Sequence, residues 1–158
     1  RSFKATWRSP GRCSPDRTQP MANTKATTVH HLVGKRFVGV TPDGMQVMID
    51  GEAEAKTGMN PMELLLNAVG ACAAFDVVEM IRKRRLDLIE YRVELEGDRA
   101  EGVPSFYTDV RTRHVINAPG LKQEMAERFV DLATNKYCSV ASSMNATMGF
   151  EVELLHET

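Results

Sequence analysis

The sequence predicts an α+β fold in which antiparallel sheets and segregated helices surround one long central helix. Strand-like segments occur in pairs joined by short connections, which is typical of hairpins rather than of strand–helix–strand units. One apolar stretch, residues 61–84, is much longer than a strand and has helix signals at both ends. The expected order of strands (β) and helices (α) along the chain is β-β-α-β-β-α-α-β.

The first expected hairpin is formed by the segments RFVGV and MQVMID, within residues 36–50. Between them lie Pro42, Asp43 and Gly44, where proline fixes φ and glycine accepts a positive φ, as a tight turn requires. Residues 51–60 are polar and small. They indicate a loop that leads into the central helix.

The central helix is predicted over residues 61–84 from its ends and its composition. Asn60 is a good N-cap, Pro61 suits the first helical position, and the anion Glu63 falls in the first turn. Four cations at residues 82–85 suit the other end. Apolar residues lie nearly all round this helix, so we expect it to be covered on most sides. One small sheet covers too little of it, and we therefore predict an intertwined homodimer.

The second expected hairpin pairs residues 89–97 with residues 105–117. In the first of these segments apolar and charged residues alternate, which is typical of a half-buried strand. Apolar residues then recur at helical spacing and predict a helix over residues 120–135. A short helix with Ser139 near its N-cap and a closing strand, FEVELL, complete the chain.

Length and composition predict one domain, residues 21–158, without nucleic-acid or membrane partners. The chain has 158 residues, of which 42% are hydrophobic and 26% charged, and its net charge is −1. The longest apolar run, residues 68–78, is interrupted by Asp76, and we interpret it as too short and too polar to span a membrane. Residues 1–20 are basic and contain three prolines. We interpret them as a disordered leader or as sequence upstream of the start at Met21, with an organelle transit peptide as the alternative.

The three cysteines, Cys13, Cys72 and Cys138, are far apart and show no CxxC spacing. This pattern disfavours a zinc site and a secreted disulfide framework, and it favours a reducing compartment, which we take to be the cytoplasm. Cys13 lies in the leader and is assigned no role. Cys72 and Cys138 are either small core residues or reactive thiols.

Local helix geometry alone would make Cys138 the more reactive thiol. Cys72 lies about eleven residues after the start of the central helix, where the helix N-terminus has little effect on its pKa. Cys138 directly precedes a short helix, whose unpaired N–H groups favour a thiolate. On this reasoning Cys138 is the nucleophile and Cys72 its partner.

Two segments carry a resemblance to a known family: NPMELLLNAVGACAAFDVV, residues 60–78, and KYCSVASSM, residues 136–144. Together they resemble the OsmC/Ohr family of thiol-dependent peroxidases, and most of all its less characterised OsmC-like branch. The resemblance covers roughly residues 30–156. It implies the OsmC-like fold and a tightly intertwined homodimer with its active sites at the subunit interface.

The resemblance also implies a reaction that reverses the order of the two thiols. Cys72 would attack an organic hydroperoxide and become a sulfenic acid, and Cys138 would condense with it to a disulfide. A dithiol reductant, for example a lipoyl group, would reset the pair. No metal or nucleotide cofactor is implied.

The sequence departs from the family pattern beside the reactive cysteine. The family glutamate directly follows the proline, where this chain has Met62. Glu63 is one residue later and rotated by about 100° around the helix, and its alternative role is that of a first-turn anion. Arg36 is the candidate for the family arginine, and an exposed strand-end arginine is the alternative. This departure motivates a second hypothesis, a weakly catalytic or non-catalytic redox-sensing or apolar ligand-binding module.

Histidines and methionines give weaker indications. His114 and the pair His30-His31 have no metal-ligand spacing, and we interpret them as sheet or surface residues. Met62, Met80, Met125 and Met144 suit either an apolar pocket for a fatty hydroperoxide or ordinary core packing. The glutamates of residues 90–96 indicate a solvated strand face.

Overall fold

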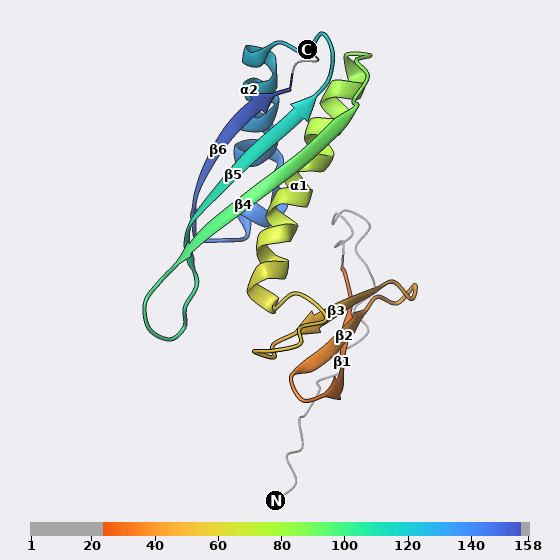
Figure 1. Ribbon diagram of the computed structural model, residues 1–158, viewed down its shortest axis with the longest axis vertical. Coiled ribbons are helices and arrows are strands. Elements are labelled where there is room, and N and C mark those ends of the chain that lie inside the picture. The colour runs from red at the N-terminus through yellow and green to blue at the C-terminus, as the bar shows by residue number, and fades with distance from the viewer. Residues whose placement is uncertain (1–23, 156–158) are drawn as a thin grey trace, which may run out of the picture.

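The computed structural model describes residues 24–155 (Figure 1). A three-stranded sheet carries helices on one face, and a second small sheet lies at the start of the long helix α1 (Figure 1). The predicted leader, with Cys13, lies outside the described residues. In chain order, the elements are β1 (Thr28–Val33), β2 (Arg36–Val40), β3 (Gln46–Asp50), α1 (Pro61–Lys83), β4 (Glu90–Arg99), β5 (Tyr107–Asn117), α2 (Gln123–Asp131), the π-helical turn η1 (Leu132–Tyr137), α3 (Ser139–Ser142) and β6 (Thr147–Leu154).

The N-terminal sheet contains the predicted hairpin and one strand more. β2 and β3 pair antiparallel, with Phe37 opposite Ile49, which confirms the hairpin. β1 pairs antiparallel with the other edge of β2. The sequence pattern did not predict β1, because all six of its residues are exposed and the apolar alternation of a half-buried strand is missing. Residues 51–60 form the predicted loop, tied to β3 by one isolated bridge between Ile49 and Met59.

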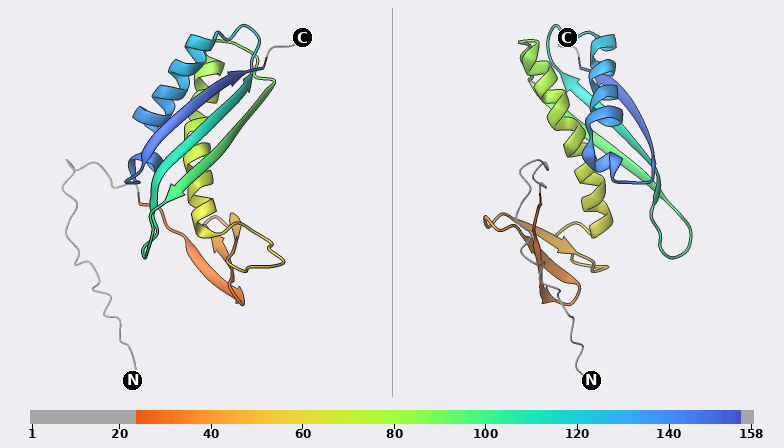
Figure 2. Two further views of the ribbon diagram at one scale, coloured as in Figure 1. Left: turned by 60° about the vertical axis from the view of Figure 1, so that its left-hand side comes forward. Right: turned by 180° about the vertical axis from the view of Figure 1, so that it is seen from behind.

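The main sheet has the order β4-β5-β6 and is mixed. β4 and β5 form the predicted antiparallel hairpin, with Tyr91 opposite Ile116. β6 runs parallel to β5, so the expectation of purely antiparallel sheets is wrong for this strand. The reason is the connection: α2, η1 and α3 carry the chain back across one face of the sheet before β6 begins (Figures 1 and 2).

α1 begins and ends where the sequence predicts. The Asn60 side chain accepts hydrogen bonds from the N–H groups of Met62 and Glu63, which completes a capping box. One face of α1 is buried against its own chain, and the opposite face leaves Phe75 76% and Val78 39% exposed. By length and composition the whole of α1 is apolar enough to cross a membrane, which the shorter run of residues 68–78 is not. In this fold it is the core helix.

The C-terminal helices differ in detail from the prediction. The helix expected over residues 120–135 begins at Gln123 and changes at Leu132 into the π-helical turn η1. Cys138 itself, rather than Ser139, is the N-cap of α3. The main hydrophobic core lies between the buried face of α1, strand β5 and helix α2. A second, smaller cluster surrounds Val69 near the first half of α1.

Candidate functional site

Cys138 is buried at the junction between η1 and α3. Its side chain is 1% exposed. The sulfur accepts a hydrogen bond from the N–H of Ala141 at 3.3 Å, because Cys138 caps the N-terminus of α3. The thiol donates in turn to the carbonyl oxygen of Val69 on α1, at 3.8 Å. The sulfur of Cys138 is thus held directly against the backbone of α1.

Cys72 lies one helical turn beyond Val69 and is half-buried. Side chains three residues apart on a helix occupy the same face, so Cys72 is beside the sulfur of Cys138. Cys72 is near enough to Cys138 to affect its pKa, and both thiols are free. The fold therefore brings together two cysteines from distant parts of the chain, with the more accessible one on α1.

Burial raises the pKa of Cys138, and the adjacent Cys72 raises it further. The N–H groups of Ala141 and Val140 act in the opposite direction but do not outweigh burial. The expectation that the start of α3 makes Cys138 the readier thiolate is therefore wrong. The fold keeps Cys138 as a protonated thiol behind Cys72.

Glu63 is placed in the cap of α1. Its carboxylate accepts a hydrogen bond from the N–H of Asn60 at 2.8 Å. Nine residues of helix separate it from Cys72, a rise of about 13 Å along the axis. This geometry matches the alternative role of a first-turn anion, and a part for Glu63 in catalysis stays a prediction.

Arg36 forms a part-buried ion pair with Asp50, a residue that the sequence pattern did not single out. The Nε of Arg36 lies 3.0 Å from the Asp50 carboxylate, and its Nη2 donates to the carbonyl of Ala55 at 2.9 Å. Asp50 is fully buried, and N–H donors from Glu52 and Thr57 hold its pKa far below the usual range. These bonds fasten the loop before α1. The sequence gives one indication of Asp50: it is a charged residue at the end of a strand, directly before a glycine.

An apolar pocket of about 510 Å³ lies beside the first half of α1. Met62 and Leu65 of α1, Phe106, Tyr107 and Met144 line it. The Tyr107 hydroxyl donates to the carbonyl of Met62 at 3.0 Å and fixes one wall. All of these side chains except Phe106 also pack in the cluster around Val69, whose carbonyl contacts the Cys138 sulfur. Met80 and Met125, by contrast, pack against the main core.

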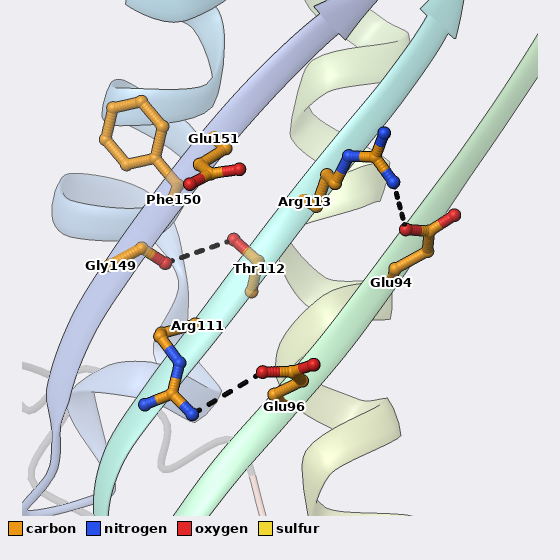
Figure 3. Close-up of a pocket in the computed structure, with 8 residues that line it drawn as sticks. All are labelled: Glu94, Glu96, Arg111, Thr112, Arg113, Gly149, Phe150 and Glu151. Atoms are coloured by element: carbon orange, nitrogen blue, oxygen red, sulfur yellow. Dashed lines mark hydrogen bonds and ion pairs between the residues drawn. The ribbon is translucent and has the colours of Figure 1, made fainter.

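A second hollow, of about 550 Å³, lies on the outer face of the main sheet (Figure 3). Charged side chains from all three strands line it, and those of β4 and β5 pair with one another. Arg113 donates to Glu94 at 2.8 Å, and Arg111 lies 3.5 Å from Glu96 (Figure 3). These ion pairs are about half-exposed, and the expectation of a solvated strand face for these glutamates is confirmed. None of the residues lining this hollow is a cysteine.

The chain is similar in sequence to a known protein family. A family model described as OsmC-like protein matches residues 51–153. Protein YhfA of Escherichia coli strain K12 is 36% identical over 128 residues, which cover 78% of this chain and 95% of that protein.

Two solved structures show the same fold. The OsmC-like protein from Mycoplasma pneumoniae is 14% identical, with a TM-score of 0.73, over 86% of this chain and 100% of that one. The organic hydroperoxide resistance protein OhrB of Bacillus subtilis is 18% identical, with a TM-score of 0.57, over 82% and 98%. At these identities the likeness concerns the fold alone.

Proposed function

This chain belongs to the OsmC-like protein family, and we propose that it is a cysteine-based peroxidase that reduces organic hydroperoxides. One observation carries the proposal: two free thiols are neighbours in the fold, with Cys72 partly accessible and Cys138 buried. A nucleophile needs access to its substrate, whereas a resolving thiol needs only access to the nucleophile. The burial of the two residues supports this division of roles.

The proposed reaction has two steps before reduction. Cys72 loses its proton, its sulfur attacks the hydroperoxide, the O–O bond breaks, and the alcohol leaves with that proton. The sulfur is oxidised to a sulfenic acid while the hydroperoxide is reduced. The Cys138 thiol then attacks the sulfenic sulfur, and water leaves as the disulfide forms. A dithiol, for example a lipoyl group, would restore both thiols in the cytoplasm.

The apolar pocket supports a preference for hydroperoxides that carry an alkyl or aromatic group. Leu65, on its wall, lies two helical turns before Cys72 on nearly the same face of α1, about 10 Å along the axis. An apolar group could occupy this wall while its peroxide end reaches the thiol. Hydrogen peroxide has no such group and gains nothing from the pocket.

A thiol count on the folded protein tests the proposed reaction. We use a Cys13→Ser background so that only Cys72 and Cys138 remain. One equivalent of cumene hydroperoxide is expected to remove both thiols and to lower the intact mass by about 2 Da, the two hydrogens of one disulfide. Hydrogen peroxide should react more slowly. Survival of both thiols in the folded protein, while the unfolded chain oxidises normally, would contradict a peroxidase.

We also propose that the protein acts as a homodimer, as members of this family typically do. The exposed apolar face of α1 and the N-terminal sheet support this proposal. That sheet stands away from the main sheet and exposes Val29 and Met45 (Figures 1 and 2).

Phe75→Glu is expected to convert the dimer to a monomer. Phe75 is 76% exposed in the single chain, and a charge there would be buried without a partner in the dimer. Light scattering and sedimentation measure the change in mass. Val103→Glu is the control, because Val103 is fully exposed at 101% on the β4–β5 connection and its replacement should leave the mass unchanged. A Phe75→Glu dimer as stable as the wild type would exclude this face of α1 from the interface.

The second candidate function is a redox-sensing or apolar ligand-binding module with little turnover. It is favoured by the surroundings of Cys72: within residues 24–155, no hydrogen bond or ion pair joins Cys72 to a glutamate or an arginine. Met62 occupies the position of the family glutamate, and Arg36 is bound to Asp50. This candidate predicts slow oxidation by cumene hydroperoxide and measurable binding of an apolar ligand to the Cys72→Ser protein.

A further inference from the structure

We propose that the π-helical turn η1 is the hinge that moves Cys138 into its disulfide with Cys72, and that Thr134 keeps this hinge ready to move. The proposal rests on the reaction assigned above to the two thiols. It concerns the step in which the Cys138 sulfur leaves its present contacts. Thr134 touches no substrate in this scheme and acts as a positioning residue.

The backbone before Cys138 is in a π-helical register. The N–H of Cys138 donates to the carbonyl of Ala133 at 2.9 Å, five residues earlier, where an α-helix would bond four residues apart. π-helical turns are rare and are frequently found at functional sites. A change of η1 toward the α register would shift the residues after it about and along the helix axis. Cys138 directly follows η1 and would move with that change.

The sulfur of Cys138 has two contacts that disulfide formation disturbs. It caps the N–H of Ala141 at 3.3 Å and donates to the carbonyl of Val69 at 3.8 Å. A disulfide sulfur has no proton to donate, and its bond to Cys72 draws it away from the start of α3. The four-residue helix α3 would then lose its cap, so the backbone on both sides of Cys138 must adjust.

Thr134 marks η1 as the place where that adjustment is favourable. Its side chain is buried, with 3% exposed, and its hydroxyl has no hydrogen-bond partner among the described residues. A buried hydroxyl without a partner raises the free energy of the conformation that contains it. In an α-helix a threonine hydroxyl can bond to the carbonyl four residues earlier, here that of Val130. A change from the π to the α register would therefore give Thr134 the partner it lacks.

The step in which the disulfide forms is the second step of the reaction proposed above. The sulfur of Cys138 attacks the sulfenic sulfur of Cys72, the S–O bond breaks, and water leaves with the thiol proton. An aromatic disulfide can replace the hydroperoxide as the oxidant. Cys72 then forms a mixed disulfide, and attack by Cys138 releases the second aromatic thiol. With this reagent the movement of Cys138 can be followed whether or not the protein reduces peroxides.

The test uses 4,4′-dithiodipyridine, in less than one equivalent, on Cys13→Ser protein. Release of the first thiopyridone reports the reaction of Cys72, and release of the second reports the attack by Cys138. Thr134→Val removes the unpaired hydroxyl while keeping the shape of the side chain. It is expected to slow the second phase about tenfold and to leave the first unchanged. The free-energy cost of one unpaired buried hydroxyl is large enough for a change of that size in rate. Thr134→Ser keeps a hydroxyl and should resolve at close to the wild-type rate. Thr108→Val, at a half-buried threonine of β5, is the matched control and should change neither phase.

Hydrogen exchange provides a readout that a purely structural role of Thr134 would not change. Oxidation is expected to accelerate exchange at the N–H groups of Ala141 and Ser142, with β4 and β5 unaffected. Equal second phases in Thr134→Val and wild type, or unchanged exchange at α3 after oxidation, would overturn the hinge. If cumene hydroperoxide fails to oxidise the protein while Thr134→Val still slows the second phase, the peroxidase is rejected and the hinge is supported.

Discussion

Cys72→Ser is expected to abolish the reduction of organic hydroperoxides, with kcat/KM falling by ~10³ or more, because the residue replaced is the proposed nucleophile. Cys72 is half-buried on α1 and is the more accessible of the two thiols. Serine is nearly the same size, so the fold and the dimer should survive. The measurement is the consumption of cumene hydroperoxide with a dithiol as electron donor, on the Cys13→Ser background.

Cys138→Ser is expected to separate the two chemical steps. The hydroxyl of serine can still cap the N–H of Ala141, so α3 should remain folded. Cys72 would then react once and stop at the sulfenic acid, which dimedone traps and mass spectrometry detects. Turnover with the dithiol should fall, while the first oxidation keeps its rate. Loss of the first oxidation in Cys138→Ser, with retention in Cys72→Ser, would reverse the roles of the two thiols.

The parts of the fold that the sequence predicts correctly are those with local causes. Asn60, Pro61 and Glu63 specify the start of α1 by interactions within four residues, and the structure contains that capping box. Pro42 and Gly44 likewise indicate the turn between β2 and β3. The alternation in residues 89–97 predicts β4 because one face of that strand is buried and the other is solvated.

The parts that sequence patterns do not predict depend on tertiary contacts. β6 is parallel to β5 because three helical segments carry the chain back across the sheet before β6 begins. No local sequence pattern encodes this path. The local helix geometry at Cys138 favours a thiolate, yet burial against Val69 of α1 dominates and raises its pKa. The pairing of Asp50 with Arg36 likewise joins two strands through side chains fourteen residues apart.

His114 lies in the core as part of a chain of buried hydrogen bonds, and it predicts how stability depends on pH. Its Nδ1 is 2.6 Å from the Tyr91 hydroxyl, and its Nε2 is 3.1 Å from the Thr112 hydroxyl. Every group is satisfied if Tyr91 donates to Nδ1, Nε2–H donates to Thr112, and Thr112 donates to the carbonyl of Gly149, 3.4 Å away. This pattern requires a neutral imidazole. A protonated His114 would turn the Tyr91 hydroxyl into an acceptor and leave its proton without that partner.

Burial lowers the pKa of His114 from 6.5 to about 4. The unfolded chain therefore takes up a proton near pH 6.5, while the folded protein does so only near pH 4. The stability contributed by neutral His114 is present above pH 6.5, declines as the pH falls through this window, and is lost below about 4. The side chain is fully buried, and the shift corresponds to about 3 kcal/mol in the free energy of unfolding. The carboxylates with lowered pKa, such as Glu94 and Asp98, lose their contributions only below their ordinary values of 4.5 and 3.8.

Urea unfolding between pH 7.5 and 4.5 measures this loss. Between pH 6 and 5 the free energy of unfolding is expected to fall by about 1.2 kcal/mol, because unfolding takes up nearly one proton in this range. His114→Gln should flatten that slope, whereas replacing the exposed His31 by glutamine should leave it unchanged. Because His114→Gln also alters the buried hydrogen bonds, the imidazole proton resonances of the wild type provide an independent reading of the folded-state titration. A His114 that titrates near pH 6.5 in the folded protein, or a stability that stays flat from pH 6.5 to 5, would exclude a neutral buried imidazole as the cause.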